Sequence, residues 1–466
     1  MKHTVNLILT AVTLAWPFHA IAAVHDTLAH GAKGDGKTVC TEAIQAAIDE
    51  AASAGGGEVV FSKPGVYLSG AIFLKSNTEL RIEKGVTLRG VQDVAAYPDA
   101  WTRVAGVEMN WPSALVNVIE AQNVKLTGAG TIDGDGSFCW EKFWGRDGQS
   151  GMMKDYIARG LRWAVDYDCK RVRLIQVYKS KDILVEGLRL ERSGFWTVHL
   201  CFSQNLICRG LTIRNNIGGL GPSSDGIDVD SSRDVLIEKC DIDCHDDNIV
   251  LKAGRDADGL RVNIPTENVE IRDCIARAGY GMVTLGSETS GWIRNVKVHD
   301  CKAIGTKHGL YFKSAKVRGG GAENIEFHNL EMEDVEIAFM FNLNWYPAYS
   351  YPVIPADVSK EDILPHWQTL TKRVEPEERG IPEYRNILFN NITVKSSGKA
   401  FEVVAYPEKP IRGFVWKNVT VNAKEAGSIA DAADWSFENV SLTTADGKSV
   451  ETKNCTGVTP PAAIKP

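Results

Sequence analysis

The sequence lacks two features that would point to a membrane or a nucleic acid. After the first 23 residues, no stretch approaches the roughly 20 consecutive apolar residues that a membrane-spanning helix needs. The 52 Lys and Arg are outnumbered by 59 Asp and Glu, and the net charge is -7. A negative chain has no general attraction for nucleic acid or anionic lipid. We therefore expect neither a membrane nor a nucleic acid as a partner.

The N-terminus has the pattern of a cleavable signal peptide over residues 1–23. Lys2 and His3 precede an apolar run from Val5 to Trp16, and Ala20 to Ala22 form an A-x-A cleavage site. The run is too short for a membrane span, and no Cys follows it as a lipid attachment point. These residues predict an exported chain, periplasmic or extracellular.

The mature chain repeats a short segment that begins with Asn or Asp. Between residues 182 and 324 successive segments start 23, 29, 34, 27 and 29 residues apart. Such spacing is typical of a solenoid, in which each repeat forms one coil. The openers are Asn123, Asp182, Asn205, Asp234, Asn268, Asn295, Asn324 and Asn386.

Each segment alternates apolar and polar residues around a bend. The residues three and six positions after the opener are apolar, so two short strands face one interior. We therefore predict an all-β fold, a right-handed parallel β-helix. Cys208, Cys240, Cys274 and Cys301 occupy positions that other coils fill with Leu, Val or Ile, and we expect buried hydrophobes there rather than disulfides.

The ends of the solenoid differ from its middle. Thr41 to Ser53 has helical spacing and is followed by three glycines, which predicts an N-terminal helix that caps the first coil. Residues 24–458 are expected to form a single β-helix catalytic domain. The tail, Thr459 to Pro466, is expected to be disordered.

Each coil has a third strand, and in four of the five aligned coils the residue before this strand is polar. Aligning GIDVD, NIVLK, GMVTL, GLYFK and AFMFN gives one predicted column: Asp225, Asp247, Tyr280, His308 and Ile337. Stacked coils would bring Asp225 and Asp247 to about 5 Å between backbones. Asp246 should lean another way, because side chains alternate along a strand.

Three carboxylates at this spacing indicate acid–base chemistry. Like charges raise one pKa, so one carboxyl can stay protonated while another stays ionised. Hydrolysis of a glycosidic bond needs that pair. The alternative is a ladder of Asp residues that satisfies turn amides, a common habit of Asp in bends.

These residues resemble motifs of glycoside hydrolase family 28, the polygalacturonase family. Ser224 to Asp228 resembles its N-T-D-G-x-D motif, and Asp246 to Asn248 resembles its D-D motif. Gly279 to Gly281 stands where the family has G-H-G, and Tyr311 to Lys313 where it has R-I-K. The resemblance covers nearly all of the mature chain.

The resemblance implies inverting hydrolysis of α-galacturonosyl linkages in pectin, without metal or cofactor. Asp246 would be the general acid, and Asp225 with Asp247 would hold the attacking water. Lys313 would bind the galacturonate carboxylate, with Tyr346 in the same subsite. The expected partner is a pectic oligo- or polysaccharide, and the chain is expected to be a monomer.

Two family residues are replaced here. Tyr280 stands for the histidine and Tyr311 for the arginine, which removes a cation from the predicted sugar-carboxylate subsite. His308 could replace the histidine, and His199, in a segment that resembles a substrate-side segment of the family, could donate to a sugar oxygen. A local basic group is expected beside the carboxylates: Lys252, Arg255, Arg261, Lys313, Lys316 and Arg318.

Long insertions at 100–120, 136–175 and 343–385 are expected along the cleft, where blocking one end would favour exo action. Three alternatives stay open. The first is a rhamnogalacturonan hydrolase or galacturonidase that cleaves galacturonate α-linked to rhamnose. The second is a Ca²⁺-dependent β-helix pectate lyase, and the third is a non-catalytic carbohydrate-binding β-helix.

Overall fold

The computed structural model describes residues 23–466 and confirms the parallel β-helix. Apart from Ala23, the predicted signal peptide lies outside the described residues. Of the strands described, 34 join in one continuous parallel sheet that winds into a coil, and two form a separate antiparallel hairpin. In residues 23–466 no helix has both the length and the apolarity to cross a membrane.

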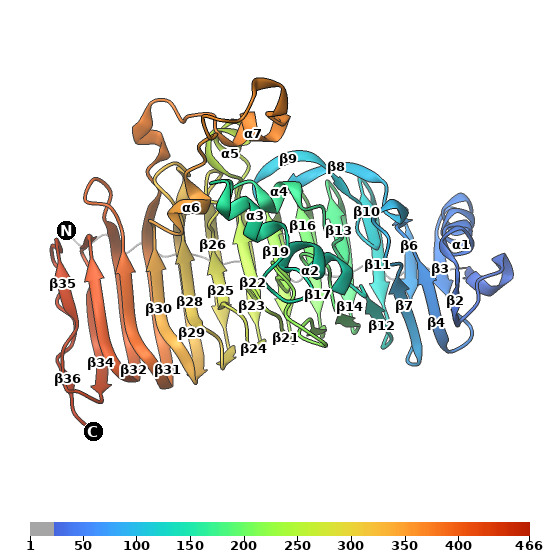
Figure 1. Ribbon diagram of the computed structural model, residues 1–466. Coiled ribbons are helices and arrows are strands. Elements are labelled where there is room, and N and C mark those ends of the chain that lie inside the picture. The colour runs from blue at the N-terminus through green and yellow to red at the C-terminus, as the bar shows by residue number, and fades with distance from the viewer. Residues whose placement is uncertain (1–22) are drawn as a thin grey trace.

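Each coil contributes strands to three faces (Figure 1). The first, here called the site face, carries the predicted column of polar residues. Its strands are β5 (Ile72–Leu74), β10 (Val116–Ile119), β13 (Ile175–Tyr178), β16 (Val198–Cys201), β19 (Ile227–Asp230), β22 (Ile249–Lys252), β25 (Gly281–Leu285), β28 (His308–Lys313) and β30 (Val335–Asn342).

The other two faces complete each coil. One consists of β1 (Val24–Asp26), β3 (Gly57–Val60), β6 (Thr78–Arg81), β11 (Gln122–Thr127), β14 (Lys181–Glu186), β17 (Gln204–Arg209), β20 (Arg233–Glu238), β23 (Thr266–Arg272), β26 (Ile293–His299) and β29 (Gly321–Glu333). The other consists of β2 (Asp35–Val39), β4 (Gly65–Ser69), β7 (Val86–Gly90), β12 (Thr131–Asp133), β15 (Arg189–Glu191), β18 (Thr212–Arg214), β21 (Asp241–Asp243), β24 (Ile275–Arg277) and β27 (Lys302–Ile304).

The last coils use longer strands that bend around more than one face. They are β31 (Glu383–Val404), β32 (Ile411–Ala430), β33 (Ala432–Ala433), β34 (Ser436–Thr444), β35 (Glu451–Lys453) and β36 (Ala463–Ile464). Strand β36 pairs with β34. The end of the tail expected to be disordered therefore has structure, because its backbone extends the edge of the sheet.

The repeat openers adopt the left-handed backbone conformation, which Asn and Asp tolerate better than other side-chain-bearing residues. Their side chains form a ladder along the outside of the coil. The Asn205 amide donates to Asp182 at 2.8 Å, and the Asn268 amide donates to Asp234 at 3.0 Å. The repeat thus marks a turn that must recur at the same place in every coil.

The interior is apolar, as the alternation predicts. The residues three positions after each opener, and those six positions after each opener from Asp182 onward, are buried in one continuous core. All ten cysteines are free, and the four in the repeat are buried within it. They replace aliphatic side chains, as expected.

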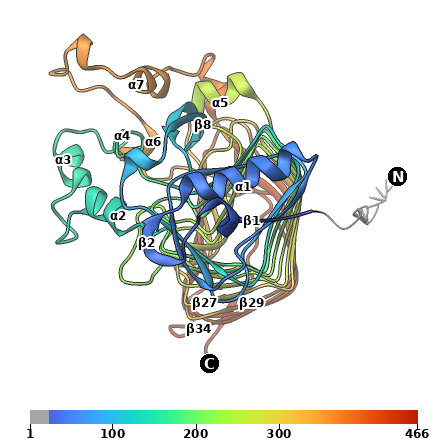
Figure 2. The same cartoon turned by 90° about the vertical axis from the view of Figure 1, so that its right-hand side faces the viewer.

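Helix α1 (Thr41–Ser53) has the bounds that the sequence predicts and lies across the N-terminal end of the coil (Figure 2). Its buried face, which includes Ile44, Ala47, Ile48 and Ala51, belongs to the main core. The helix therefore keeps the apolar end of the first coil out of water.

The predicted insertions stand on one side of the coil (Figures 1 and 2). The first is the hairpin of β8 (Asp99–Val104) and β9 (Val107–Pro112). The others carry the helices α2 (Ser137–Trp144), α3 (Met152–Ala158), α4 (Val165–Asp168), α6 (Pro347–Ser350) and α7 (Pro365–Leu370), with α5 (Asp256–Val262) beside them. The short 3₁₀ helices are η1 (Thr27–His30), η2 (Val94–Ala96), η3 (Lys360–Asp362) and η4 (Glu377–Gly380).

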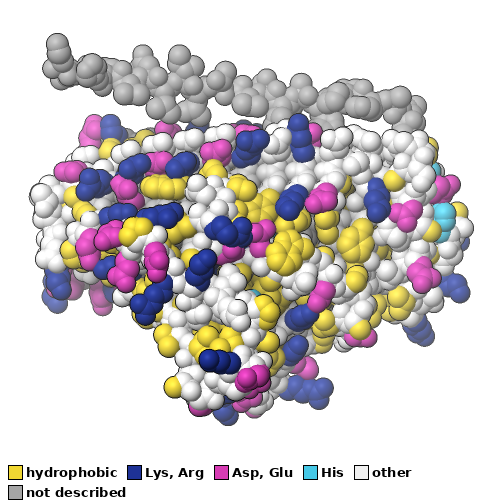
Figure 3. Space-filling view, turned by 90° about the horizontal axis from the view of Figure 1, so that it is seen from above, with side chains coloured by type: hydrophobic (Ala, Val, Ile, Leu, Met, Phe, Trp, Pro, Cys, Tyr) yellow, Lys and Arg dark blue, Asp and Glu magenta, His cyan; other side chains and the backbone are white. Residues whose placement is uncertain are grey.

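These insertions share a second hydrophobic core outside the coil. The hairpin contributes Val104 and Trp111, the second insertion Trp163, and the third Tyr349 and Trp367. Seen from above, hydrophobic side chains alternate with charged ones across this side of the molecule (Figure 3). The three insertions therefore pack as one wall rather than as independent loops.

Candidate active site

The three predicted carboxylates lie together on the site face. Ile227 of β19 pairs with Ile249 of β22, and this register sets Asp225 beside Asp247. One oxygen from each of Asp225, Asp246 and Asp247 lies within 4.8 Å of the others. Asp225 and Asp247 are buried, and Asp246 is partly exposed.

Burial and mutual repulsion favour protonation of part of this cluster. Burial, followed by the charges of Asp228 and Asp246, raises the pKa of Asp225 well above its usual value. Burial and the Asp247 charge raise the pKa of Asp246. Burial also raises the pKa of Asp228, to about 7. A carboxyl that keeps its proton near neutral pH can serve as a general acid.

Asp247 is held by two donors. The Lys313 ammonium lies 2.6 Å from its Oδ2, and the Thr284 hydroxyl donates to its Oδ1 at 2.7 Å. Burial disfavours the charged form of Lys313, but the Asp247 charge outweighs it and raises the pKa of the ammonium. Lys313, predicted to bind a sugar carboxylate, is thus engaged with Asp247.

Lys252 lies below the cluster rather than in contact with the groove. Its side chain is 6 % exposed, and its Nζ lies 3.5 Å from Asp225, 3.4 Å from Asp228 and 3.7 Å from Glu288. Burial lowers the pKa of the ammonium, but the charges of these carboxylates raise it well above the ordinary value. Lys252, expected in the basic group beside the carboxylates, thus lies within ion-pair distance of three buried carboxylates.

His199 is also buried rather than open to a substrate. It is fully buried beneath the Trp196 ring, with ring centroids 4.8 Å apart, and its Nε2 lies 3.5 Å from Asp230. Burial lowers the pKa of the imidazole to about 4. A neutral, enclosed histidine supports the floor of the site, so the predicted hydrogen bond to a sugar oxygen has no direct path.

The predicted column is displaced by one residue at β25. Gly281, not Tyr280, pairs with His308, and Val283 rather than Met282 pairs with Ile249. The Gly279–Gly281 turn adds one residue before β25. The inward and outward positions of the side chains along β25 are therefore shifted by one residue. The shift turns Thr284 toward Asp247.

Tyr280 instead lies beside Asp246, at the rim of the cluster. Its backbone N–H donates to the Asp246 carbonyl at 2.9 Å, and its partly exposed ring neighbours His245 and His308. Burial lowers the pKa of His308 to about 4. This rim is made of neutral imidazoles and a phenol, together with the ammonium of Lys307, whose Nζ lies 3.9 Å from the Tyr280 ring centroid.

Tyr311 and Tyr346 occupy different surroundings. Tyr311 is buried on the site face, 4.4 Å from the His308 ring. Tyr346 is 40 % exposed, and its hydroxyl accepts a 2.9 Å hydrogen bond from Arg162. The rings beside Lys313 are those of Trp345, at 4.7 Å from Nζ, and Tyr311, at 5.0 Å, rather than that of Tyr346.

The expected basic group is paired with acidic residues. Besides Lys252 and Lys313, its members form ion pairs as follows: Arg255 and Arg318 with Asp256, Arg261 with Glu108 and Asp258, and Lys316 with Glu408. The charges of this expected basic group therefore face acidic residues of the protein itself, which positions along the sequence do not show.

Two clusters of side chains have the donor types that metal ions use. In the aspartate cluster, two ammonium groups already lie against Asp225 and Asp247. In the second cluster, of His199, Cys201 and Asp230, the Arg103 guanidinium lies 2.8 Å from Asp230. A cation at either place would meet a positive charge, so neither environment suits a resident metal.

The hairpin tip reaches over the site face. The Gly106 carbonyl accepts a hydrogen bond from the Arg255 N–H at 3.1 Å, and the Ala105 carbonyl accepts one from the Tyr167 hydroxyl at 2.9 Å. A side-chain carbon at Gly106 would meet Glu288 at 2.8 Å. Glu288 in turn lies 3.7 Å from Lys252, so the hairpin tip is linked to the carboxylate cluster through these two residues.

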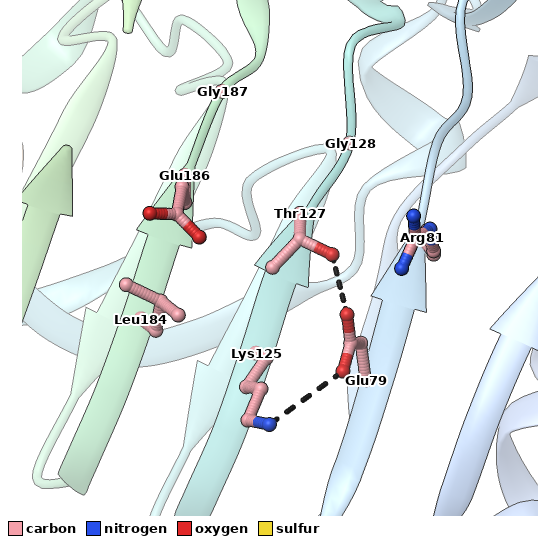
Figure 4. Close-up of a pocket in the computed structure, with 8 residues that line it drawn as sticks. All are labelled: Glu79, Arg81, Lys125, Thr127, Gly128, Leu184, Glu186 and Gly187. Carbon is pink, nitrogen blue, oxygen red and sulfur yellow. Dashed lines mark hydrogen bonds and ion pairs between the residues drawn. The ribbon is translucent and has the colours of Figure 1, made fainter. Parts of the chain in front are cut away.

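A shallow hollow of about 300 Å³ lies on a different face. Figure 4 shows Glu79 of β6 between Thr127 and Lys125 of β11, with Glu186 of β14 alongside. These strands do not carry the aspartates. The hollow therefore forms no part of the candidate site.

Comparisons with known proteins agree with this geometry. Residues 57–358 match glycosyl hydrolases family 28. The chain is 29 % identical to a "Probable polygalacturonase" of Vitis vinifera over 391 residues, which cover 80 % of this chain and 74 % of the relative. It is 25 % identical to an exo-poly-alpha-D-galacturonosidase of Dickeya chrysanthemi over 494 residues, 92 % of this chain and 75 % of the relative.

Solved structures show the same fold. An exopolygalacturonase from Thermotoga maritima superimposes with a TM-score of 0.71 at 28 % identity, covering 86 % of this chain and 87 % of its own. A family 28 exopolygalacturonase from Yersinia enterocolitica gives 0.73 at 22 % identity, covering 94 % and 78 %. The chain is a right-handed parallel β-helix that belongs to glycosyl hydrolases family 28 and is a glycoside hydrolase.

Proposed function

We propose that this chain hydrolyses α-galacturonosyl linkages of pectic polysaccharides by a single displacement that inverts the anomeric carbon. The observation that carries the proposal is the cluster of Asp225, Asp246 and Asp247, with one oxygen from each within 4.8 Å. The polygalacturonase relatives support the choice of substrate.

Asp246 is the proposed general acid. Its burial and its neighbour Asp247 raise its pKa, so it can carry a proton to the leaving oxygen. Asp247 is held by Lys313 and Thr284 and, with Asp225, orients the attacking water. Lys252 and Lys313 supply the positive charge that the cluster needs, and the proposed chemistry uses no metal.

The spacing makes the stereochemical outcome a sharp test. Inverting glycosidases usually hold two carboxyl groups about 6.5–9.5 Å apart to admit a water, whereas retaining ones hold them about 5–5.5 Å apart. Here one oxygen from each of the three aspartates lies within 4.8 Å of the others. Inversion at this spacing requires Asp225 and Asp247 to hold the water together, because the cluster has no wide gap between two carboxyl groups. Retention would show that Asp225 or Asp247 attacks the sugar instead.

We also propose exo action. The three insertions share one core, and their hairpin tip lies against Glu288, so in this proposal the wall blocks one end of the groove. A groove closed on one side of the scissile bond accepts a chain end rather than its middle. The exo-acting relatives from Dickeya chrysanthemi and Thermotoga maritima support this choice.

Export and a single catalytic domain complete the proposal. Residues 1–23 would be removed as a signal peptide, leaving a monomeric β-helix over 24–458. The residue pattern at the N-terminus supports export.

The test is an assay of the purified mature chain on polygalacturonate and on rhamnogalacturonan oligosaccharides, with EDTA present. We expect reducing ends, no unsaturated product, and monogalacturonate as the first product from polygalacturonate. Asp246→Asn should lower kcat at least 100-fold, because it removes the acid. Asp273→Asn is the matched control, since Asp273 is an exposed turn carboxylate on another face.

Each other outcome has a defined meaning. Unsaturated product would identify a lyase and contradict hydrolysis. Activity on rhamnogalacturonan alone would retain the mechanism and replace the substrate. Full activity in Asp246→Asn would remove this residue as the acid.

A further inference from the structure

The two lysines beside the catalytic cluster form ion pairs with carboxylates of the protein. Lys313 lies 2.6 Å from Asp247, and Lys252 lies between Asp225, Asp228 and Glu288. Both are buried. An ammonium held in this way directs part of its charge to the carboxylates of the cluster, so a cation outside these pairs is the one free to serve an acidic sugar at the rim.

Lys307 differs from both. It is partly exposed, and within residues 23–466 no carboxylate lies within ion-pair distance of it. Its Nζ lies over the Tyr280 ring, 3.9 Å from the centroid. A cation on an aromatic face keeps its charge while its direction is fixed, because the ring restrains the flexible side chain.

The backbone places this ammonium at the rim of the site. The Tyr280 N–H donates to the Asp246 carbonyl at 2.9 Å, and the Lys307 N–H donates to the Gly279 carbonyl at 2.9 Å. Lys307 therefore stands two coils beyond the proposed acid, on the same edge of the groove.

The imidazoles beside Lys307 on this edge are neutral, and Glu336 of the next coil stands in register with Lys307 without forming an ion pair with it. His308 is 9 % exposed, its Nδ1 has no hydrogen-bond partner, and burial holds its pKa at about 4. Burial also lowers the pKa of His245. Two neutral imidazoles can exchange hydrogen bonds with sugar hydroxyls, and the positive charge for an acidic sugar is left to Lys307.

We infer that Lys307 binds the carboxylate of a substrate galacturonate and that Tyr280 fixes the ammonium for this contact. The inference rests on the proposed function and names the group that recognises the acid at this edge. It assigns that role to a residue outside the buried Lys313–Asp247 pair.

The test compares Lys307→Met with wild type on oligogalacturonate and on its methyl ester. Binding is measured by calorimetry in the Asp246→Asn background, so that both ligands stay intact. We expect Lys307→Met to weaken binding of the acid about 10- to 100-fold, as for loss of a charge-assisted hydrogen bond. Binding of the ester should change less than about threefold. In the otherwise wild-type enzyme, KM should rise while kcat is nearly kept.

Lys307→Arg should keep most of the affinity for the acid, because the charge remains over Tyr280. Lys302→Met is the matched control on β27: it removes an exposed lysine that pairs with Glu331 at 3.6 Å, away from the groove, and should leave binding unchanged.

Equal losses for acid and ester, or no loss for the acid, would overturn the inference while the proposed hydrolysis stands. If wild type cleaves no galacturonate linkage, the proposed function itself fails. Melting temperatures of all variants show whether any loss comes from unfolding.

Discussion

Replacing Lys252 by Met removes the ammonium that lies 3.4–3.7 Å from Asp225, Asp228 and Glu288. Methionine has nearly the same length, so the main change is electrostatic. Three buried carboxylates then lose the ammonium that they share, and Glu288 keeps the charges of Arg318, Lys313 and Arg255. Because the Asp225 and Asp228 pKa values are already raised with Lys252 present, they should rise further without it.

Breaking a buried ion pair from one side costs about 3–5 kcal/mol. With an unfolding entropy of about 2.1 cal/mol/K per residue, a chain of 466 residues should lose about 3–5 °C in Tm. The raised pKa of Lys252 means that its contribution is complete below the pKa of an unfolded lysine and is lost only as pH rises beyond it. A raised carboxyl pKa acts in the same sense but at lower pH: stability is highest below the pKa of an unfolded carboxyl and falls as pH rises through the raised value of Asp225 and Asp228. The loss should therefore be larger at pH 8 than at pH 5, where the carboxyls can take up protons.

Two assays measure this effect. Calorimetric melting from pH 5 to pH 8 gives the stability, and the pH profile of kcat/KM gives the ionisation of Asp225. We expect the acidic limb of that profile to move to higher pH in Lys252→Met, with recovery in Lys252→Arg. Adding Glu288→Gln should restore part of the stability. A Tm loss that is independent of pH, or strictly additive effects of Lys252→Met and Glu288→Gln, would refute the electrostatic reasoning.

Three further outcomes follow from particular contacts. Arg103→Met should lower Tm by about 3–5 °C at pH 7, because it leaves Asp230 as an unpaired buried charge. Burial raises the pKa of the Asp230 carboxyl, but the Arg103 charge outweighs burial and helps to hold this pKa at about 2. The loss of Tm should therefore diminish only as pH falls toward that value. A Tm unchanged at pH 7 would contradict this. Thr284→Val should lower kcat about 10-fold with a smaller change in KM, since it deletes the hydroxyl that orients Asp247; steady-state kinetics decide, and unchanged kcat would remove the donor from the mechanism. Dialysis against EDTA should leave both the rate and Tm unchanged, whereas loss of activity that Ca²⁺ restores would point to a metal-dependent reaction.

The coil itself could be predicted from the sequence because its signals are local. Asn and Asp openers such as Asn205 and Asn268 mark a backbone turn with positive φ, and the apolar positions follow at fixed distances. Thr41–Ser53 has the period and composition of a helix and forms one. The aspartates were placed together for the same reason, since neighbouring coils repeat in register.

The errors arose where the repeat is interrupted or where contacts are remote. The extra residue at Gly279–Gly281 shifts the register of β25 by one position. In the sequence alignment Thr284 falls at a position where the other strands have apolar residues that face the core, whereas in the structure it donates to Asp247. A non-apolar residue at a predicted interior position was the available signal. Glu288 comes from a loop after β25, and no local pattern links it to Lys252.

The charge partners of the lysines could not be predicted from the sequence either. The motif resemblance singles out Lys313, and Lys252 stands out as a cation near the aspartates, but pairing with Asp247 and with three buried carboxylates is a property of the folded coil. Lys307 drew no attention in the sequence because it belongs to no motif. Its importance depends on which neighbouring charges are already neutralised.

The configuration of the first product tests the central claim most directly. Oligogalacturonate would be digested inside an NMR tube, and the anomeric protons of the new reducing end followed before mutarotation. Inverting hydrolysis through Asp246 and a water held by Asp225 and Asp247 predicts that the β-anomer appears first from the α-linkage. The α-anomer as first product would contradict the single displacement, and a 4,5-unsaturated product would contradict hydrolysis altogether.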